Sequence, residues 1–132
     1  MGSRGELLSL LSLTIFLLKG EIIINYIDFE VNGKSYKLRL TTRNIVLLEK
    51  QLGCNPLRIF GDGEEVPTIT VMVAILHASL QQYNHGITLN DAYDIFDDYL
   101  ADGHSTVDFI PVILDIYRAS GIIPKETERK NA

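Results

Sequence analysis

The sequence is short of cysteine and of positive charge. Its 132 residues include one cysteine, Cys54, no tryptophan and four prolines, and 12 lysines and arginines stand against 17 aspartates and glutamates. A single cysteine excludes an internal disulfide and a multi-cysteine zinc site, which fits a reducing compartment. The formal net charge of −5 provides no overall positive field for binding phosphates. We therefore expect no nucleic-acid partner.

The composition is that of one folded domain. Hydrophobic residues make up 46% and charged residues 22% of the chain, close to the globular averages of about 45–50% and about 25%. A chain of this length holds one sizeable core, so a multidomain enzyme is not expected. Disordered, collagen-like and coiled-coil proteins are disfavoured by the same numbers.

An apolar run lies near the amino end. Residues Leu7–Leu18 read LLSLLSLTIFLL, which is too short for the roughly 20 apolar residues of a membrane-spanning helix, so we expect no membrane partner. Glu6 and the lack of a small-residue cleavage site disfavour a secretory signal. We interpret residues 1–23 as an apolar extension. One hypothesis places it upstream of the natural start, because Lys19–Glu21 can be encoded by a ribosome-binding sequence; the intact mass of the native protein tests this.

A β-hairpin is predicted after this extension. Residues 27–31 alternate between apolar and acidic side chains, and Asn32-Gly33 follows, a pair that suits the two positive-φ positions of a type I′ turn. A two-residue turn fixes the register, which pairs Val31 with Lys34, Phe29 with Tyr36, Asp28 with Lys37, and Ile27 with Leu38. The apolar face of an isolated hairpin needs cover, so it is expected to pack on helices.

Apolar residues then recur at helical spacing. The predicted helical segments begin at the N-cap Thr42 and end at Gly53, make one turn over Leu57–Phe60, cover Thr68–Tyr83, and run from Thr88 to Gly103 and from Ser105 to Gly121. Pro111 either kinks the last helix or lies in its first turn. The predicted fold is therefore α+β, mainly α: an N-terminal β-hairpin packed on about four to five helices in one domain, residues 24–124, before a polar tail, residues 125–132.

No motif for catalysis, cofactor binding or metal binding is evident in the sequence. The three histidines, His77, His85 and His104, share no ligand spacing. Ser79 follows His77 by two residues, and positions two apart on a helix point in different directions. Four aspartates lie at helical spacing opposite an apolar stripe, where a solvated face or a surface for a basic partner is expected: Asp94, Asp97, Asp98 and Asp102. We expect no catalytic residue, cofactor or metal, and a binding role is the favoured class.

Three segments carry a family resemblance. They are RNIVLLEKQLGCNPLRIF (Arg43–Phe60), ILHASLQQYNHGITLNDAYDIFDDY (Ile75–Tyr99) and IYRASGIIP (Ile116–Pro124). Together they resemble the small tail assembly chaperones of siphophages and prophages of Gram-positive bacteria, which share a hairpin followed by helices. The resemblance implies a non-enzymatic protein of the bacterial host cytosol that keeps the long tape measure protein soluble until the tail tube forms around it. Family members often have a frameshifted longer form, and this chain resembles the short one.

The resemblance also suggests partners and contact residues. The tape measure protein is the main expected partner, and the tail tube protein and further copies of the chain are additional candidates. A long amphipathic helix exposes apolar stripes that small protein covers can shield. We expect exposed aromatics and an acidic row at the edges of the helical part to make the contact: Phe60, Tyr83, Tyr93, Tyr99, Asp94, Asp97 and Asp98.

Two other functions stay open at the level of sequence. One is a minor tail protein that remains in the virion, which mass spectrometry of purified particles would reveal. The other is a metal-dependent hydrolase that uses His85, His104 and the aspartates, which metal analysis would reveal. The neighbouring genes are the most informative further observation, because a tube gene upstream and a tape measure gene downstream would support the chaperone.

Overall fold

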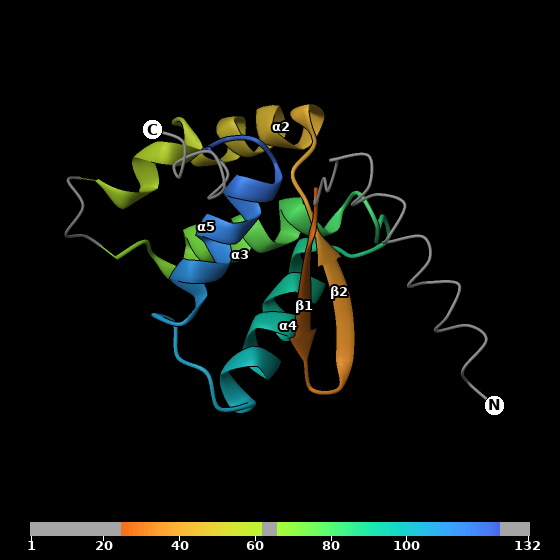
Figure 1. Ribbon diagram of the computed structural model, residues 1–132. Coiled ribbons are helices and arrows are strands. Elements are labelled where there is room, and N and C mark those ends of the chain that lie inside the picture. The colour runs from red at the N-terminus through yellow and green to blue at the C-terminus, as the bar shows by residue number, and fades with distance from the viewer. Residues whose placement is uncertain (1–24, 62–65, 125–132) are drawn as a thin grey trace, which may run out of the picture.

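The computed structural model describes residues 25–61 and 66–124 (Figure 1). The predicted apolar extension, residues 1–23, and polar tail, residues 125–132, lie outside the described residues. The elements are β1 (Ile27–Val31), β2 (Lys34–Leu38), α2 (Thr42–Leu52), the 3-10 turn η1 (Pro56–Phe60), α3 (Ile69–Leu80), α4 (Leu89–Ala101) and α5 (Phe109–Ala119). The predicted α+β, mainly α fold with its N-terminal hairpin is confirmed.

The hairpin has the predicted register. Val31 lies opposite Lys34, Phe29 opposite Tyr36, Asp28 opposite Lys37, and Ile27 opposite Leu38. Asn32 and Gly33 have φ values of 52° and 79°, the left-handed conformation that a type I′ turn requires. The apolar face of this two-stranded sheet, with Phe29, Val31 and Leu38 buried, packs on the helices.

Side-chain caps set the starts of α2 and η1. Thr41, rather than the predicted Thr42, caps α2: its Oγ1 accepts a 3.2 Å hydrogen bond from the Asn44 amide, and its extended backbone suits a cap. Thr42 is instead the first helical residue. Asn55 caps η1 through a 2.9 Å bond from the Leu57 amide, so the predicted single turn before Gly61 is present.

The central helix is α3, with residues 72–76 all buried. Thr68 caps it by accepting from the Val71 amide at 3.2 Å. The helix ends at Leu80, three residues before the predicted Tyr83. The Gln81 side-chain amide donates to the carbonyls of His77, at 3.1 Å, and Ile87, at 2.8 Å. These bonds hold the chain in a turn in place of a further helical turn.

Capping pairs also precede α4 and α5. Thr88 and Asp91 form the predicted capping box of α4. Ser105 and Asp108 bond reciprocally as predicted, at 2.8 and 3.3 Å. This pair closes the turn before α5, which begins at Phe109, so Pro111 lies in the first turn of the helix and does not interrupt it.

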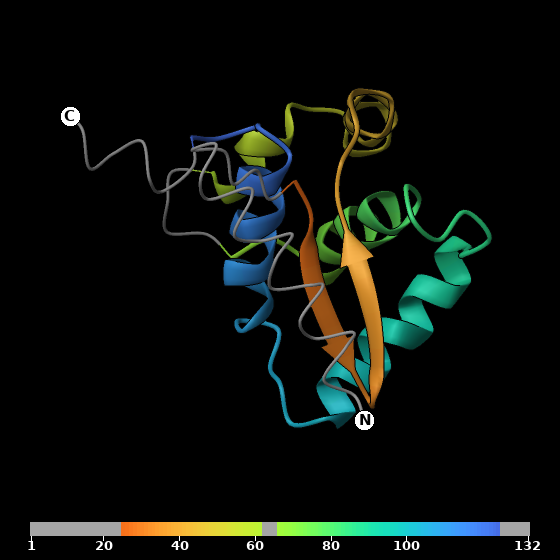
Figure 2. The same ribbon diagram turned by 45° about the vertical axis from the view of Figure 1, so that its right-hand side comes forward.

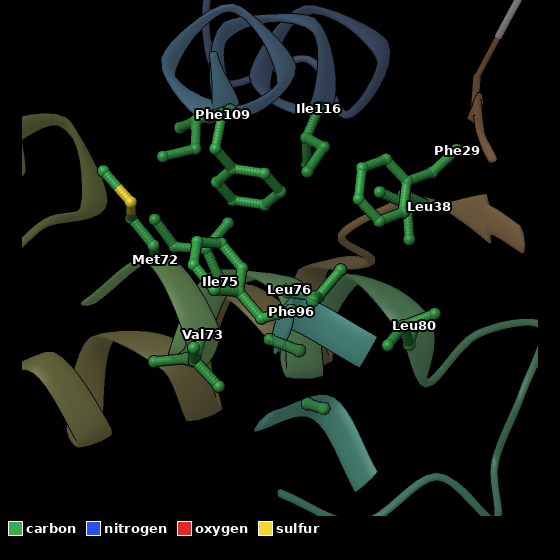
Figure 3. Packing of buried hydrophobic residues seen from close by; sticks show 14 of the residues in the cluster. Phe29, Leu38, Met72, Val73, Ile75, Leu76, Leu80, Phe96, Phe109 and Ile116 are labelled. Carbon is green, nitrogen blue, oxygen red and sulfur yellow. The ribbon is translucent and has the colours of Figure 1, made fainter. Parts of the chain in front are cut away.

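The core lies where the hairpin, α3, α4 and α5 meet (Figure 3). Phe109 of α5 points toward Met72 and Ile75 of α3, and its ring meets Phe96 edge-on at 5.3 Å. In both ribbon views α2 lies above α3 and α4 lies below it (Figures 1 and 2). The outer faces of α2 and α4 therefore point away from each other. None of the described helices combines the length and apolarity needed to cross a bilayer.

Candidate partner-binding surface

The outer face of α4 brings four of the predicted contact residues together. Tyr93, Asp94, Asp97 and Asp98 are all exposed, Tyr93 at 41% of its surface. The opposite side of the helix is buried in the core, through Ala92, Ile95, Phe96 and Tyr99. Residues three and four apart share a helix face, and the spacing of the sequence therefore places the tyrosine and the three carboxylates side by side. We call these four residues the acidic face of α4.

The acidic face works against the stability of its own helix. Asp94 and Asp98 are like charges at i,i+4, a spacing that destabilises a helix by about 0.2–0.5 kcal/mol. The last turn of α4 contains no basic residue, so the negative end of the helix dipole lies next to the carboxylates. Within residues 25–61 and 66–124, these three aspartates form no ion pair. The charge is thus free to attract a basic partner.

Tyr83 lies in a separate aromatic group. It follows the end of α3, and its ring meets that of Tyr26 edge-on at 5.8 Å. The ammonium of Lys37 on β2 lies 4.8 Å from the Tyr26 ring centroid and 5.9 Å from that of Tyr83. Tyr83 remains 40% exposed. It can contact a partner, but as part of a cation–aromatic group on the hairpin and not of the acidic face.

Tyr99 was expected at the surface, and this expectation is wrong. Only 4% of its surface is exposed. Its ring lies 5.2 Å from Phe29 and 5.8 Å from Phe109, because it occupies the inward stripe of α4 one turn after Ile95 and Phe96. Burial, and secondarily the charge of Asp108, raises the pKa of Tyr99. It is a core residue and is not available to a partner.

Phe60 is only partly exposed. It is half-buried at the end of η1 and meets the buried Tyr117 ring edge-on, with the centroids 6.4 Å apart. One side of Phe60 therefore covers the core, and only its remaining surface faces outward. It exposes a smaller fraction of its side chain than Tyr83 or Tyr93 does.

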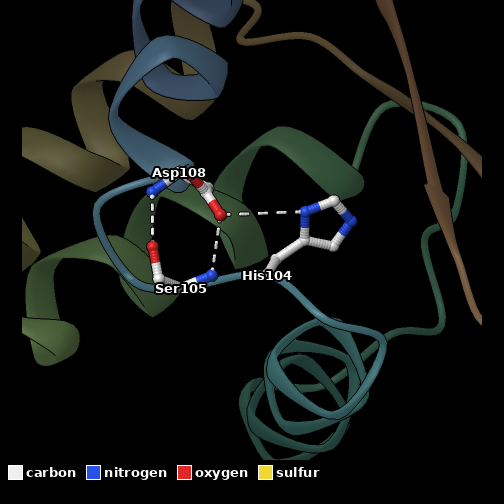
Figure 4. Close-up of polar contacts among 3 residues, drawn as sticks. All are labelled: His104, Ser105 and Asp108. Carbon is white, nitrogen blue, oxygen red and sulfur yellow. Dashed lines mark hydrogen bonds and ion pairs between the residues drawn. The ribbon is translucent and has the colours of Figure 1, made fainter.

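The histidines proposed for a hydrolase lie apart. His85 precedes α4 and His104 follows it, so the helix separates them. The His104 ring stacks on Tyr99, with centroids 4.3 Å and planes 7° apart, and its Nδ1 lies 4.0 Å from the Asp108 carboxylate, which also accepts from the Ser105 amide (Figure 4). Among the described residues, no three or more histidines, cysteines and acids gather as a metal site would require.

A polar hollow lies beside the start of α2. Its volume is about 470 Å³, and it is lined by Thr41, Thr42, Arg43, Asn44, Gln81, Gln82 and His85. The lining contains no carboxylate to pair with His85, and no hydroxyl or thiol hydrogen-bonded to that imidazole is present among the described residues. The hollow therefore supplies hydrogen-bond donors and one guanidinium, without a nucleophile and base in contact.

The sequence interpretation missed a second surface, on α2. Arg43, Val46, Leu47 and Lys50 are exposed, Val46 at 42% and Leu47 at 56%. We call them the basic face of α2. The signal was present: once Ile45, Leu48 and Leu52 form the inward stripe, the helical period of 3.6 residues turns positions 46 and 47 outward. Two exposed aliphatic side chains therefore lie side by side between two cations on this face.

Residues 22–132 match a protein family described as a family of unknown function (DUF6096). The match covers most of the chain, and the chain therefore belongs to this family. No curated protein and no solved structure matches the chain. The matched residues include the hairpin and every described helix, so the acidic face of α4 and the basic face of α2 both lie within the family region.

Proposed function

We propose that this member of DUF6096 is a phage tail assembly chaperone that acts without catalysis. In this proposal it binds the tape measure protein in the cytosol of the bacterial host and keeps it soluble during tail assembly. The acidic face of α4 is the main contact, and Tyr83 with the outward side of Phe60 forms additional contacts.

The acidic face is the observation that carries the proposal. Three carboxylates without an ion-pair partner among the described residues lie beside one exposed tyrosine, on a helix that they destabilise. Local features that reduce stability are expected where function requires them. An aromatic side chain beside carboxylates can cover an apolar stripe while the charges attract the basic residues that flank it.

The physical task suits a small protein. A long helical polypeptide exposes apolar stripes before the tube encloses it, and large exposed apolar patches lead to aggregation. Burying one large apolar side chain contributes about 1.5–3 kcal/mol. Many small covers, each shielding a few such side chains, are therefore sufficient to keep the polypeptide in solution. The resemblance in residues 43–60, 75–99 and 116–124 supports this task.

Binding can be tested with a variant of the acidic face and a matched control. Asp94→Asn, Asp97→Asn and Asp98→Asn together should weaken co-purification with a tagged tape measure protein of the same phage or prophage by at least tenfold. The control, Asp28→Asn, Glu30→Gln and Asp115→Asn, removes the same charge from exposed positions outside α4. Equal co-purification of both variants would contradict the proposed contact.

A second experiment separates the chaperone from a minor tail protein. A chaperone leaves the tail when the tube is complete, so mass spectrometry of purified virions should not detect this chain in fixed ratio to the tape measure protein. Detection in such a ratio would favour a structural protein that is retained in the particle.

A further inference from the structure

The basic face of α2 and the acidic face of α4 are complementary. Arg43 and Lys50 lie seven residues apart, about 10.5 Å along the axis at a rise of 1.5 Å per residue. Val46 and Leu47 lie between these cations and are largely exposed. The acidic face offers three carboxylates beside an exposed tyrosine. Each face thus supplies the charge that the other needs and an apolar surface for it to cover.

One molecule cannot bring its two faces together. Both helices pack on α3, α2 from above and α4 from below in both ribbon views (Figures 1 and 2). Their outer faces are directed to opposite sides of the molecule. A contact between the faces therefore requires two molecules.

We propose that the basic face of α2 docks on the acidic face of α4 of a second copy of this chain. Arg43 and Lys50 pair with Asp94, Asp97 and Asp98 of the other copy, and Val46 and Leu47 cover its Tyr93. The negative end of the α4 dipole adds to the attraction. The two faces differ, so the contact is heterologous and leaves a free face at each end, from which a chain or a ring grows.

The contact has a consequence for tape measure binding, and here the inference rests on the proposed function. A copy whose acidic face is covered by α2 of its neighbour cannot offer that face to the tape measure protein. Self-association and tape measure binding at this face therefore exclude each other.

Analytical ultracentrifugation of the full chain tests the contact. The wild-type mass should rise with concentration and fall when the ionic strength increases from about 0.05 to about 0.5 M, because salt screens exposed charges. Arg43→Glu with Lys50→Glu, and separately the three Asp→Asn substitutions of α4, should each weaken self-association by at least tenfold. Lys34→Glu with Arg58→Glu, which changes the charge equally at exposed positions outside α2, should have less than a twofold effect.

Mixing the two defective proteins is the decisive step. The α2 variant retains an acidic α4 face and the α4 variant retains a basic α2 face, so an equimolar mixture should form a 1:1 complex that grows no further. A wild-type protein that is monomeric throughout, variants that assemble like the wild type, or a mixture that stays monomeric would each overturn the proposal.

The tape measure protein separates this inference from the proposed function. The α2 variant should still co-purify with the tape measure protein, because its acidic face is intact. Loss of self-association with tape measure binding retained supports both proposals. Assembly that follows the pattern above without any tape measure binding supports the copy contact and contradicts the chaperone.

Discussion

The hydroxyl of Tyr117 donates a 2.9 Å hydrogen bond to the carbonyl oxygen of Pro56, and both residues are buried. The two residues are 61 positions apart in the chain. This bond joins α5 to η1, and it gives the carbonyl of the first η1 residue a donor from a distant part of the chain.

Replacing Tyr117 with Phe should therefore lower the free energy of unfolding. The ring still fills its site, but the Pro56 carbonyl loses its side-chain donor and keeps only the helical bond of η1, which costs about 0.5–1.5 kcal/mol. Urea denaturation measures the change. Tyr93→Phe, at an exposed position, is the control and should change stability by less than about 0.5 kcal/mol. Equal stability of the two variants would show that the carbonyl finds another partner.

Stability should also fall at alkaline pH. Burial, and secondarily the neighbouring Cys54, raises the pKa of Tyr117 above its ordinary value of 10.0. The unfolded chain then releases this proton near pH 10 while the folded protein keeps it. The stabilisation is complete below that pH and is lost above it, by up to about 1.4 kcal/mol per pH unit for one group. Urea denaturation at several pH values above 10 gives the free energy of unfolding at each pH. This free energy should fall less steeply with pH in Tyr117→Phe than in the wild type. An equally steep fall in both proteins would exclude Tyr117 as the cause.

The hairpin was predictable because its determinants are local. Alternation fixes which side chains share a face, and Asn32-Gly33 fixes the turn and hence the register. The end of α3 was less predictable, because Tyr83 continues a helical apolar pattern. The bonds from Gln81 to two carbonyls decide where α3 ends, and one of them crosses to Ile87 beyond the turn.

Gly33→Ala should destabilise the protein by about 1 kcal/mol, because a side chain at a φ of 79° strains the backbone. A Cβ at this position meets nothing within 4 Å, so the effect is conformational and not steric. Gly86→Ala is the matched control: its Cβ also has open space, and its φ is not in the left-handed range. Thermal unfolding should show a lower melting temperature for Gly33→Ala only, and equal values would argue against the type I′ turn.

Truncating the two tyrosines of α4 should change the stability of the protein by very different amounts. Tyr99→Ala removes a ring from the core and should cost about 3–5 kcal/mol. Tyr93→Ala removes an exposed ring and should change stability by less than about 0.5 kcal/mol, while weakening tape measure binding. Chemical denaturation and co-purification measure the two effects. A large loss of stability in Tyr93→Ala would show that Tyr93 is a core residue and not part of the binding surface.

The candidate surface was predictable in part. Helical spacing placed Asp94, Asp97 and Asp98 opposite the apolar stripe, but it could not show which of Tyr93 and Tyr99 is exposed, because both tyrosines follow the apolar pattern of the same helix. Tyr99 is buried because aromatic side chains of the hairpin and α5 surround it. The basic face of α2 was not predicted, because the spacing of Ile45, Leu48 and Leu52 shows which side of the helix is inward but not whether another element covers Val46 and Leu47 on the other side.

The soluble fraction of the tape measure protein, expressed in bacteria with and without this chain, tests the central claim most directly. The protein should be found mainly in the soluble fraction when the wild-type chain is co-expressed and mainly in the pellet when the chain is absent or carries the three Asp→Asn substitutions of α4. A tape measure protein that is equally soluble with and without the chain would contradict the chaperone function.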